Sequence, residues 1–229
     1  MKQIIALGGG GFSMEPDNPL LDLYILGQSQ KETPKICFIP TASGDADSYI
    51  GRFYDFFKQQ DCEPTHLSLF KPPAQALEEL VLSQDILYVG GGNTKNLLVL
   101  WKEWGLDRII EKAWNQGIIL AGISAGSICW FEQGVTDSYG EDLHALACLG
   151  FLPGSNCPHY DGEANRRPAF QRLLTEGLIK PGLAADDGAA LHFIGQDLHG
   201  AVSSRPHAKA YRVARGSEQE LETRFLGKE

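Results

Sequence analysis

The chain has 229 residues, of which 43% are hydrophobic and 21% are charged, a composition typical of a soluble globular protein. Its 20 basic and 29 acidic residues give a formal net charge of −9, which argues against a nucleic-acid-binding face and against attraction to anionic membranes. The length suits one α/β domain, which we expect to span residues 1–229.

The sequence contains no run of about 18 apolar residues, so we expect no transmembrane helix. Its first apolar run leads directly into glycines instead of a secretory cleavage site, and we expect a cytoplasmic protein, either a monomer or a homodimer. The five cysteines, an odd number without short-range pairs, favour reduced thiols over disulfides and indicate no zinc site.

Short apolar runs alternate with helical patterns along the first half of the chain. Strands are predicted at 4–7, 35–40, 65–70, 85–89 and 118–121, and helices at 45–60, 95–102 and 107–115. This alternation predicts an α/β fold, in which a mostly parallel sheet carries helices on both faces.

The pattern weakens after Ser138, where a loop-rich region is predicted to run to about Pro158. A helix is predicted at 164–176, and late, partly antiparallel strands at 183–185, 189–194, 200–203 and 208–213. A hairpin turn is predicted at 198–200, and the charged residues 218–229 are expected to fray.

Clusters of small residues follow four of the predicted strands. They occupy residues 8–11, 41–44, 90–94 and 122–126. Because ligands of such sheets bind outside the carboxyl ends of the strands, these four turns predict a site at one sheet edge.

The segment Gly122-Ile123-Ser124-Ala125-Gly126 lies between a predicted strand and a predicted helix. A serine on such a sharp turn presents its hydroxyl at the sheet edge, where a base can activate it. Ser124 is therefore the candidate nucleophile, with a helix N-cap as the alternative interpretation.

A serine nucleophile needs a base, and histidine suits neutral pH. Of the six histidines, His159 follows Pro158 in a turn-rich segment downstream of Ser124, so we predict that His159 is the base.

The third group should be a carboxylate that orients the imidazole. We favour Asp137, on the loop expected after the helix that carries Ser124. Glu132, Glu141 and Asp142 are less favoured alternatives, because Glu132 would still lie on that helix and Glu141 and Asp142 resemble a solvated turn.

The developing oxyanion needs two donors. The backbone N–H of Ala125 should supply one, and an amide of Gly91 or Gly92 in the 90–94 turn could supply the other. A phosphate-binding loop is the weaker reading, since no Lys-Ser/Thr pair ends this turn.

The glycine turn at 90–94, the serine turn at 122–126 and the Pro158-His159 loop occur in the order found in peptidase E. The chain resembles this aspartyl dipeptidase family, related to cyanophycinase, over most of its length. The resemblance implies a fold like the class I glutamine amidotransferase domain and a metal-free Ser–His–acid site of Ser124, His159 and, as the nearest match, Asp137.

The resemblance also implies a serine exopeptidase that hydrolyses short peptides with an N-terminal aspartate and uses no cofactor. Candidates for substrate binding are Asn93, Arg166 and Arg167, the arginines as partners for the substrate carboxylate. An amidase, an esterase or an isoaspartyl peptidase on the same fold remains an alternative, as do a small-molecule binding module and cysteine chemistry at Cys157 or Cys129.

Overall fold

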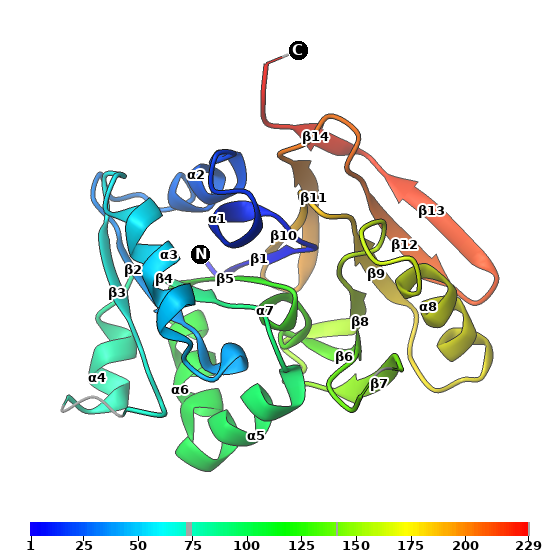
Figure 1. Ribbon diagram of the computed structural model, residues 1–229, viewed down its shortest axis with the longest axis horizontal. Coiled ribbons are helices and arrows are strands. Elements are labelled where there is room, and N and C mark those ends of the chain that lie inside the picture. Colours follow the sequence, from blue (N-terminus) through cyan, green and yellow to red (C-terminus); the bar gives the residue numbers. More distant parts are fainter. Residues whose placement is uncertain (72–74, 141, 229) are drawn as a thin grey trace.

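The computed structural model describes residues 1–71, 75–140 and 142–228 (Figure 1). Its strands are β1 (Gln3–Leu7), β2 (Lys35–Ile39), β3 (Glu63–His66), β4 (Ile86–Val89), β5 (Ile119–Ile123), β6 (Phe131–Thr136), β7 (His144–Ala147), β8 (Leu152–Cys157), β9 (Gly182–Ala185), β10 (Ala189–Ile194), β11 (Asp197–Ser203), β12 (Ala210–Ala214), β13 (Ser217–Leu221) and β14 (Thr223–Phe225). Its helices are α1 (Gly11–Met14), α2 (Leu20–Leu26), the 3-10 helix η1 (Thr41–Ser43), α3 (Asp47–Phe57), α4 (Leu77–Leu82), α5 (Thr94–Trp104), α6 (Leu106–Asn115), α7 (Ala125–Ile128) and α8 (Arg166–Thr175).

The larger sheet has eight strands in the order β14-β11-β10-β1-β5-β4-β2-β3. Strands β1, β5, β4, β2 and β3 are parallel, whereas β10 pairs antiparallel with β1. Leu7, the last residue of β1, lies opposite Ile123 of β5 and Ala190 of β10. The carboxyl end of β1 therefore lies between the turn that follows β5 and the turn that precedes β10.

Alternate residues of the central strands are buried on opposite faces of this sheet. Ile4 and Ala6 of β1 join a cluster with Val81, Leu97, Trp101 and Ile110 of α4, α5 and α6. Ile5 and Leu7 join a second cluster with Phe12, Leu21 and Phe53 of α1, α2 and α3. The predicted α/β fold with helices on both faces is confirmed.

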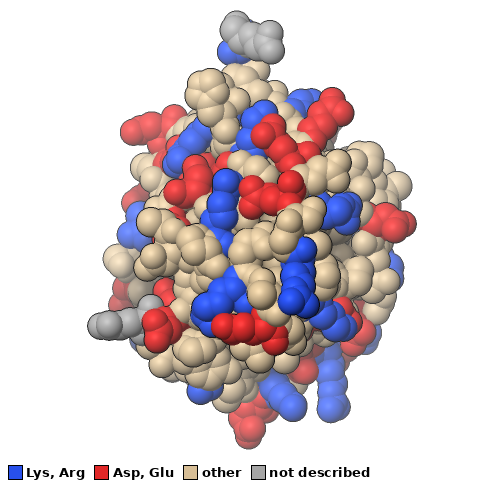
Figure 2. All heavy atoms as spheres, turned by 90° about the vertical axis from the view of Figure 1, so that its right-hand side faces the viewer, with Lys and Arg blue, Asp and Glu red and all other residues tan. Residues whose placement is uncertain are grey.

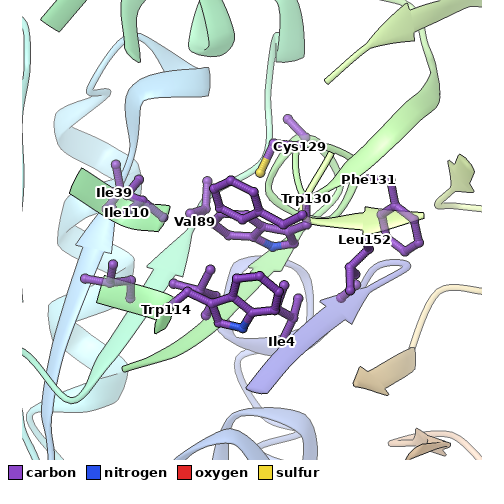
Figure 3. Close-up of a cluster of buried hydrophobic side chains, with 14 of the residues drawn as sticks. Ile4, Ile39, Val89, Ile110, Trp114, Cys129, Trp130, Phe131 and Leu152 are labelled. Carbon is purple, nitrogen blue, oxygen red and sulfur yellow. The ribbon is translucent and has the colours of Figure 1, made fainter. Parts of the chain in front are cut away.

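A second sheet of six strands, β13-β12-β9-β8-β6-β7, lies beside the first (Figure 1). One of its faces packs against α8 through Phe170, Leu173 and Val135. Phe131 and Leu152 of β6 and β8 lie in the same buried cluster as Ile4, Val89 and Trp114 (Figure 3). The two sheets thus share one core on the face covered by α4, α5 and α6.

The second half of the chain corrects several predictions. The segment from Ser138 to Pro158, predicted as loop, contains β7 and β8. The sequence of β8 includes proline and glycine, yet it forms a strand because β6 and β9 pair with it on both sides. Residues expected to fray at the C-terminus include β13 and β14. The hairpin turn predicted at 198–200 is wrong, since these residues lie within β11 and the reversal occurs at Gly195, whose φ is 61°.

Acidic and basic side chains are interspersed on the face that carries α8 and β13 (Figure 2). Ion pairs there include Arg167–Glu218 at 3.4 Å and Arg172–Glu176 at 3.1 Å. Within the described ranges, none of the helices has both the length and the apolar character needed to span a bilayer.

Candidate active site

Ser124 occupies a strained turn between β5 and α7, with φ 57° and ψ −112°. A side chain at Gly122 would overlap the carbonyl of Gly126, and a side chain at Gly126 would overlap the carbonyl of Val89. The two glycines are therefore required by close backbone approach, which explains the Gly-x-Ser-x-Gly spacing. Ser124 is only half-buried although its neighbours are buried, and among the described residues its hydroxyl makes no capping bond to α7.

The end of β1 anchors three separate segments through consecutive carbonyl groups. The carbonyl of Leu7 accepts a hydrogen bond from the N–H of Ser124 at 3.3 Å. That of Gly8 accepts one from His159 at 3.0 Å, and that of Gly9 accepts one from Gly188 at 3.0 Å. Because neighbouring carbonyls hold them, the serine turn, the histidine loop and the turn before β10 meet at the predicted sheet edge.

His159 and Asp187 form a hydrogen-bonded pair at the centre of this edge. Nδ1 of His159 lies 2.6 Å from Oδ1 of Asp187, and the side chains are only 12% and 13% exposed. His159 itself has a φ of 53°, a conformation that few residues other than glycine adopt without support. With Nδ1 bound to the carboxylate, Nε2 is the ring nitrogen that remains to act on a nucleophile.

The Asp187 carboxylate is held by close backbone approach on two sides. A side chain at Gly9 would overlap Oδ1, and one at Gly162 would overlap Oδ2. The N–H of Asp187 donates to Oδ1 of Asp161 at 2.8 Å, which fixes the turn before β10. The neighbouring Asp186 is 3% exposed, and burial raises its pKa to about 6.

The prediction that Asp137 orients His159 is wrong in this structure, because Asp187 binds the imidazole. Asp137 has a side chain that is 59% exposed, and it lies 4.0 Å from Arg166. The expected helix after Ser124 stops at Ile128, and the chain continues as the extended strand β6. An extended strand advances about 3.3 Å per residue, so β6 carries Asp137 away from the serine turn.

Of the alternative acids, the two that the structure describes, Glu132 and Asp142, do not contact His159. Glu132 lies on β6, where its carboxylate accepts hydrogen bonds from Lys180 and from the N–H of Gly154. Asp142 is exposed, and Glu141 lies outside the described residues. Asp187 was missed because it comes late in the chain, although the signal was present: an Asp-Asp-Gly turn between two predicted strands.

The glycine turn at 90–92 lies against the serine turn, as predicted. A Cβ on Gly91 would lie 3.3 Å from Cβ and 3.8 Å from Oγ of Ser124. The N–H of Gly91 donates to Oη of Tyr49 at 3.2 Å, whereas Gly92 is exposed and has a φ of 136°. Ala125 is the first residue of α7, so its N–H is among those without an acceptor within the helix.

The three residues proposed to bind substrate have structural partners instead. Asn93 caps α5 by accepting from the N–H of Asn96 at 2.9 Å, and its amide donates to the carbonyl of Ser138 at 3.2 Å. Arg166 is 3% exposed and binds Glu163 at 2.6 Å and the carbonyl of Val135 at 2.9 Å.

Arg167 lies against two aromatic rings. Its guanidinium carbon is 4.5 Å from the ring centre of Tyr160 and 4.8 Å from that of Tyr211, and it pairs with Glu218 at 3.4 Å. The structure therefore gives both arginines internal contacts and does not support the expectation that they receive a substrate carboxylate.

The cysteines lack the surroundings of a reactive thiol. Cys157 and Cys129 are buried. Burial raises the pKa of Cys157 to about 12 and that of Cys129 well above its ordinary value. A thiolate is the reactive form of cysteine, so neither residue is suited to nucleophilic chemistry at neutral pH.

The model of peptidase family S51 matches residues 4–200 of this chain. The chain belongs to peptidase family S51. It is therefore a peptidase, and the serine type of that family agrees with the Ser124 turn. The uncharacterized peptidase YgaJ of Bacillus subtilis (strain 168) is 62% identical over 231 residues, which cover 99% of this chain and 100% of that protein.

Two solved structures show that the S51 chain shares its fold with other peptidases. A peptidase from an acI-B1 Actinobacterium superposes with a TM-score of 0.73 at 21% identity, covering 97% of this chain and 95% of that chain. A peptidase E protein from Listeria monocytogenes EGD-e gives a TM-score of 0.63 at 18% identity, covering 93% and 100%. At these identities the likeness concerns the fold alone.

Proposed function

We propose that this S51 chain is a serine exopeptidase that cleaves short peptides through Ser124, His159 and Asp187. The observation that carries the proposal is the bond between Nδ1 of His159 and Oδ1 of Asp187, at 2.6 Å. The consecutive carbonyls of Leu7 and Gly8 accept the N–H groups of Ser124 and His159, which supports the same assignment. This arrangement supplies a nucleophile, a base and an orienting carboxylate.

In the first half of the reaction, Nε2 of His159 accepts the hydroxyl proton of Ser124 as Oγ attacks the peptide carbonyl carbon. The tetrahedral adduct collapses when His159 passes that proton to the leaving amine and the carbon–nitrogen bond breaks. In the second half, His159 takes a proton from water as the water oxygen attacks the acyl carbon. The ester bond between that carbon and Oγ then breaks, His159 returns the proton to Oγ of Ser124, and the acid product leaves. The negative charge of Asp187 stabilises the imidazolium in both halves.

The oxyanion of each adduct requires donors beside Ser124. The N–H of Ala125 directly follows the nucleophile, and the 90–92 turn borders Ser124 so closely that a Cβ on Gly91 would lie 3.3 Å from the Cβ of that serine. This set of groups completes acyl transfer without requiring a metal or an organic cofactor. The proposed partner is the peptide substrate, with neither nucleic acid nor membrane involved.

For the substrate, we propose short peptides, and dipeptides with an N-terminal aspartate first among them. This preference rests on the resemblance to peptidase E, because Arg166 and Arg167 are engaged within the chain. The clearest comparison is a panel of Asp-X dipeptides, the same dipeptides with other first residues, isoaspartyl peptides and p-nitrophenyl esters.

The test of the chemistry uses Ser124→Ala beside the wild-type protein. We expect the wild type to cleave at least one peptide of the panel and to be labelled at Ser124 by a fluorophosphonate. The Ser124→Ala variant should lose both properties at unchanged thermal stability. Dipeptide hydrolysis that survives this substitution would refute the mechanism, and turnover of esters alone would point to the esterase alternative.

A further inference from the structure

Tyr49 of α3 lies beneath the glycine turn and has no part in the mechanism described so far. It is 7% exposed and belongs to the cluster on the α1–α3 side of the main sheet. Its ring packs edge-on against Phe38 at 4.9 Å and lies 5.8 Å from Phe12, measured between ring centres. These contacts fix the direction of the ring and therefore the position of its hydroxyl.

The hydroxyl of Tyr49 points at the turn that borders Ser124. It accepts a hydrogen bond from the N–H of Gly91 at 3.2 Å. A Cβ on the preceding Gly90 would lie 3.1 Å from Cε1 of Tyr49, so the ring also touches the other end of this peptide. On its other side, Gly91 approaches the side chain of Ser124, where a Cβ would lie 3.3 Å from that of the serine.

The next part of the turn, Gly92 and Asn93, lies against η1. A side chain at Gly92 would overlap the carbonyl of Ala42 in η1, and the same carbonyl accepts the N–H of Asn93 at 2.8 Å. The turn is thus held by Tyr49 at Gly91 and by Ala42 at Asn93. Gly92, between these two contacts, is exposed to solvent.

We infer that Tyr49 is a positioning residue, which holds the Gly91 peptide so that the N–H of Gly92 faces the oxyanion formed on Ser124. This inference rests on the proposed function, since it presumes acyl transfer at Ser124. It also selects one of the two glycines predicted as oxyanion donors. The N–H of Gly91 is bound to Tyr49, so the N–H of Gly92 would act on the oxyanion together with the N–H of Ala125. Preorganisation of such donors is a major source of rate in acyl transfer.

The hydroxyl of Tyr49 stays neutral under ordinary assay conditions. Burial raises the pKa of Tyr49, while hydrogen bonds from Ser13 and from the N–H of Gly91 and the charge of Arg52 act in the opposite direction. The contribution of Tyr49 should therefore be the same across the neutral pH range. This property separates it from His159, whose protonation state enters the mechanism directly.

The test compares Tyr49→Phe with Tyr54→Phe. Tyr54 lies on the same helix, and its hydroxyl binds Nδ1 of His66 at 2.8 Å, so the control also removes one hydrogen-bonded oxygen from α3. We expect Tyr49→Phe to lower kcat by about tenfold with KM within about twofold, the size expected for one neutral hydrogen bond acting on the transition state. Tyr54→Phe should retain the wild-type kcat.

The affinity for a peptide aldehyde distinguishes a role in oxyanion stabilisation from a purely structural role of Tyr49. The aldehyde forms a tetrahedral adduct with Ser124, so its affinity should fall in Tyr49→Phe by the same factor as kcat, with the midpoints of the pH–rate profile unchanged. Wild-type kcat in Tyr49→Phe, an effect on KM alone, or unchanged aldehyde affinity would each overturn the inference.

Two further measurements keep the outcome decisive. Amide hydrogen exchange of Gly91 in the wild-type protein should be slow, and rapid exchange would overturn the inference even if Tyr49→Phe did not fold. If a fluorophosphonate labels Ser124 while Tyr49→Phe is fully active, the inference alone fails. If Ser124→Ala retains peptidase activity, the proposed function fails and the inference falls with it.

Discussion

Nδ1 of His159 lies 2.6 Å from Oδ1 of Asp187, although 28 positions separate the two residues in the sequence. They meet because His159 is anchored on the carbonyl of Gly8, and Gly9 pairs with the turn that holds Asp187. The end of β1 therefore assembles the candidate site, and the groups proposed to perform the chemistry come from three other segments.

This relationship predicts different effects for two conservative substitutions. Asp187→Asn should lower kcat by about 10²–10⁴-fold, because the amide cannot stabilise the imidazolium or hold the required tautomer. Asp137→Asn should stay within about threefold of the wild type, since Asp137 is exposed and lies near Arg166. Steady-state kinetics on a cleaved dipeptide checks both, and the reverse order of effects would restore Asp137 as the acid.

Gly9 should tolerate no side chain. In Gly9→Ala the new methyl group would meet Oδ1 of Asp187 and lie 3.0 Å from Nδ1 of His159. We expect a loss of about 100-fold or more in kcat/KM, because small displacements of catalytic groups are costly. Gly200→Ala, where nothing lies within 4 Å of the new atom, is the matched control and should keep full activity.

The buried carboxyl group of Asp22 should make the free energy of unfolding depend on pH. It is fully buried, and its Oδ2 accepts the N–H of Phe12 at 2.7 Å. Desolvation raises its pKa from 3.8 to about 7, although the bond from Phe12 acts to lower it. The folded protein therefore binds this proton more tightly than the unfolded chain, and the free energy of unfolding should fall as pH rises from about 4 to 7.

The Asp22→Asn variant should lack this fall. Between about pH 5 and pH 7, the free energy of unfolding of the wild type should drop by about 2 kcal/mol relative to Asp22→Asn, measured by urea denaturation. Substitution of the exposed Asp61 by Asn should leave the wild-type slope in place. Parallel pH profiles for wild type and Asp22→Asn would contradict the assignment.

Loss of the Arg166 side chain should lower the free energy of unfolding more than loss of the Arg167 side chain. Arg166→Ala removes the hydrogen bonds that the guanidinium donates to the carbonyl of Val135 and to Glu163, and it should lower the free energy of unfolding by about 1–3 kcal/mol. Arg167→Ala loses contacts with Tyr160 and Tyr211 and an ion pair that is half-exposed on the arginine side, so about 1 kcal/mol is expected. If either variant instead raised KM only for peptides with an N-terminal aspartate, it would be a substrate ligand after all.

The cysteines should be unreactive in the folded protein. Burial raises the pKa of Cys157 and of Cys148 to about 12, so little thiolate is present at neutral pH. We expect iodoacetamide to leave peptidase activity unchanged over the time that inactivates an exposed thiol. Loss of activity in step with alkylation of Cys157 would support the cysteine alternative.

Some parts of the fold were predictable because their signals are local. The parallel strands β1, β2, β4 and β5 are mostly apolar runs that end in small residues, and the order of these runs implies a common carboxyl edge. The second sheet was not predictable in this way. The strand β8 contains proline and glycine, and β13 is mostly exposed and polar, so pairing with neighbouring strands, not local propensity, makes them strands.

The sequence by itself determined the serine turn, because only Gly122 and Gly126 permit the close backbone contacts on either side of Ser124. It also indicated His159, since a proline-led turn stood downstream of that serine. Only the tertiary structure brought Asp187 against His159 and Tyr49 against Gly91. Asp187 reaches His159 through the antiparallel placement of β10 beside β1, and Tyr49 reaches Gly91 from a helix 42 positions away. Both are contacts between distant segments, which no local pattern specifies.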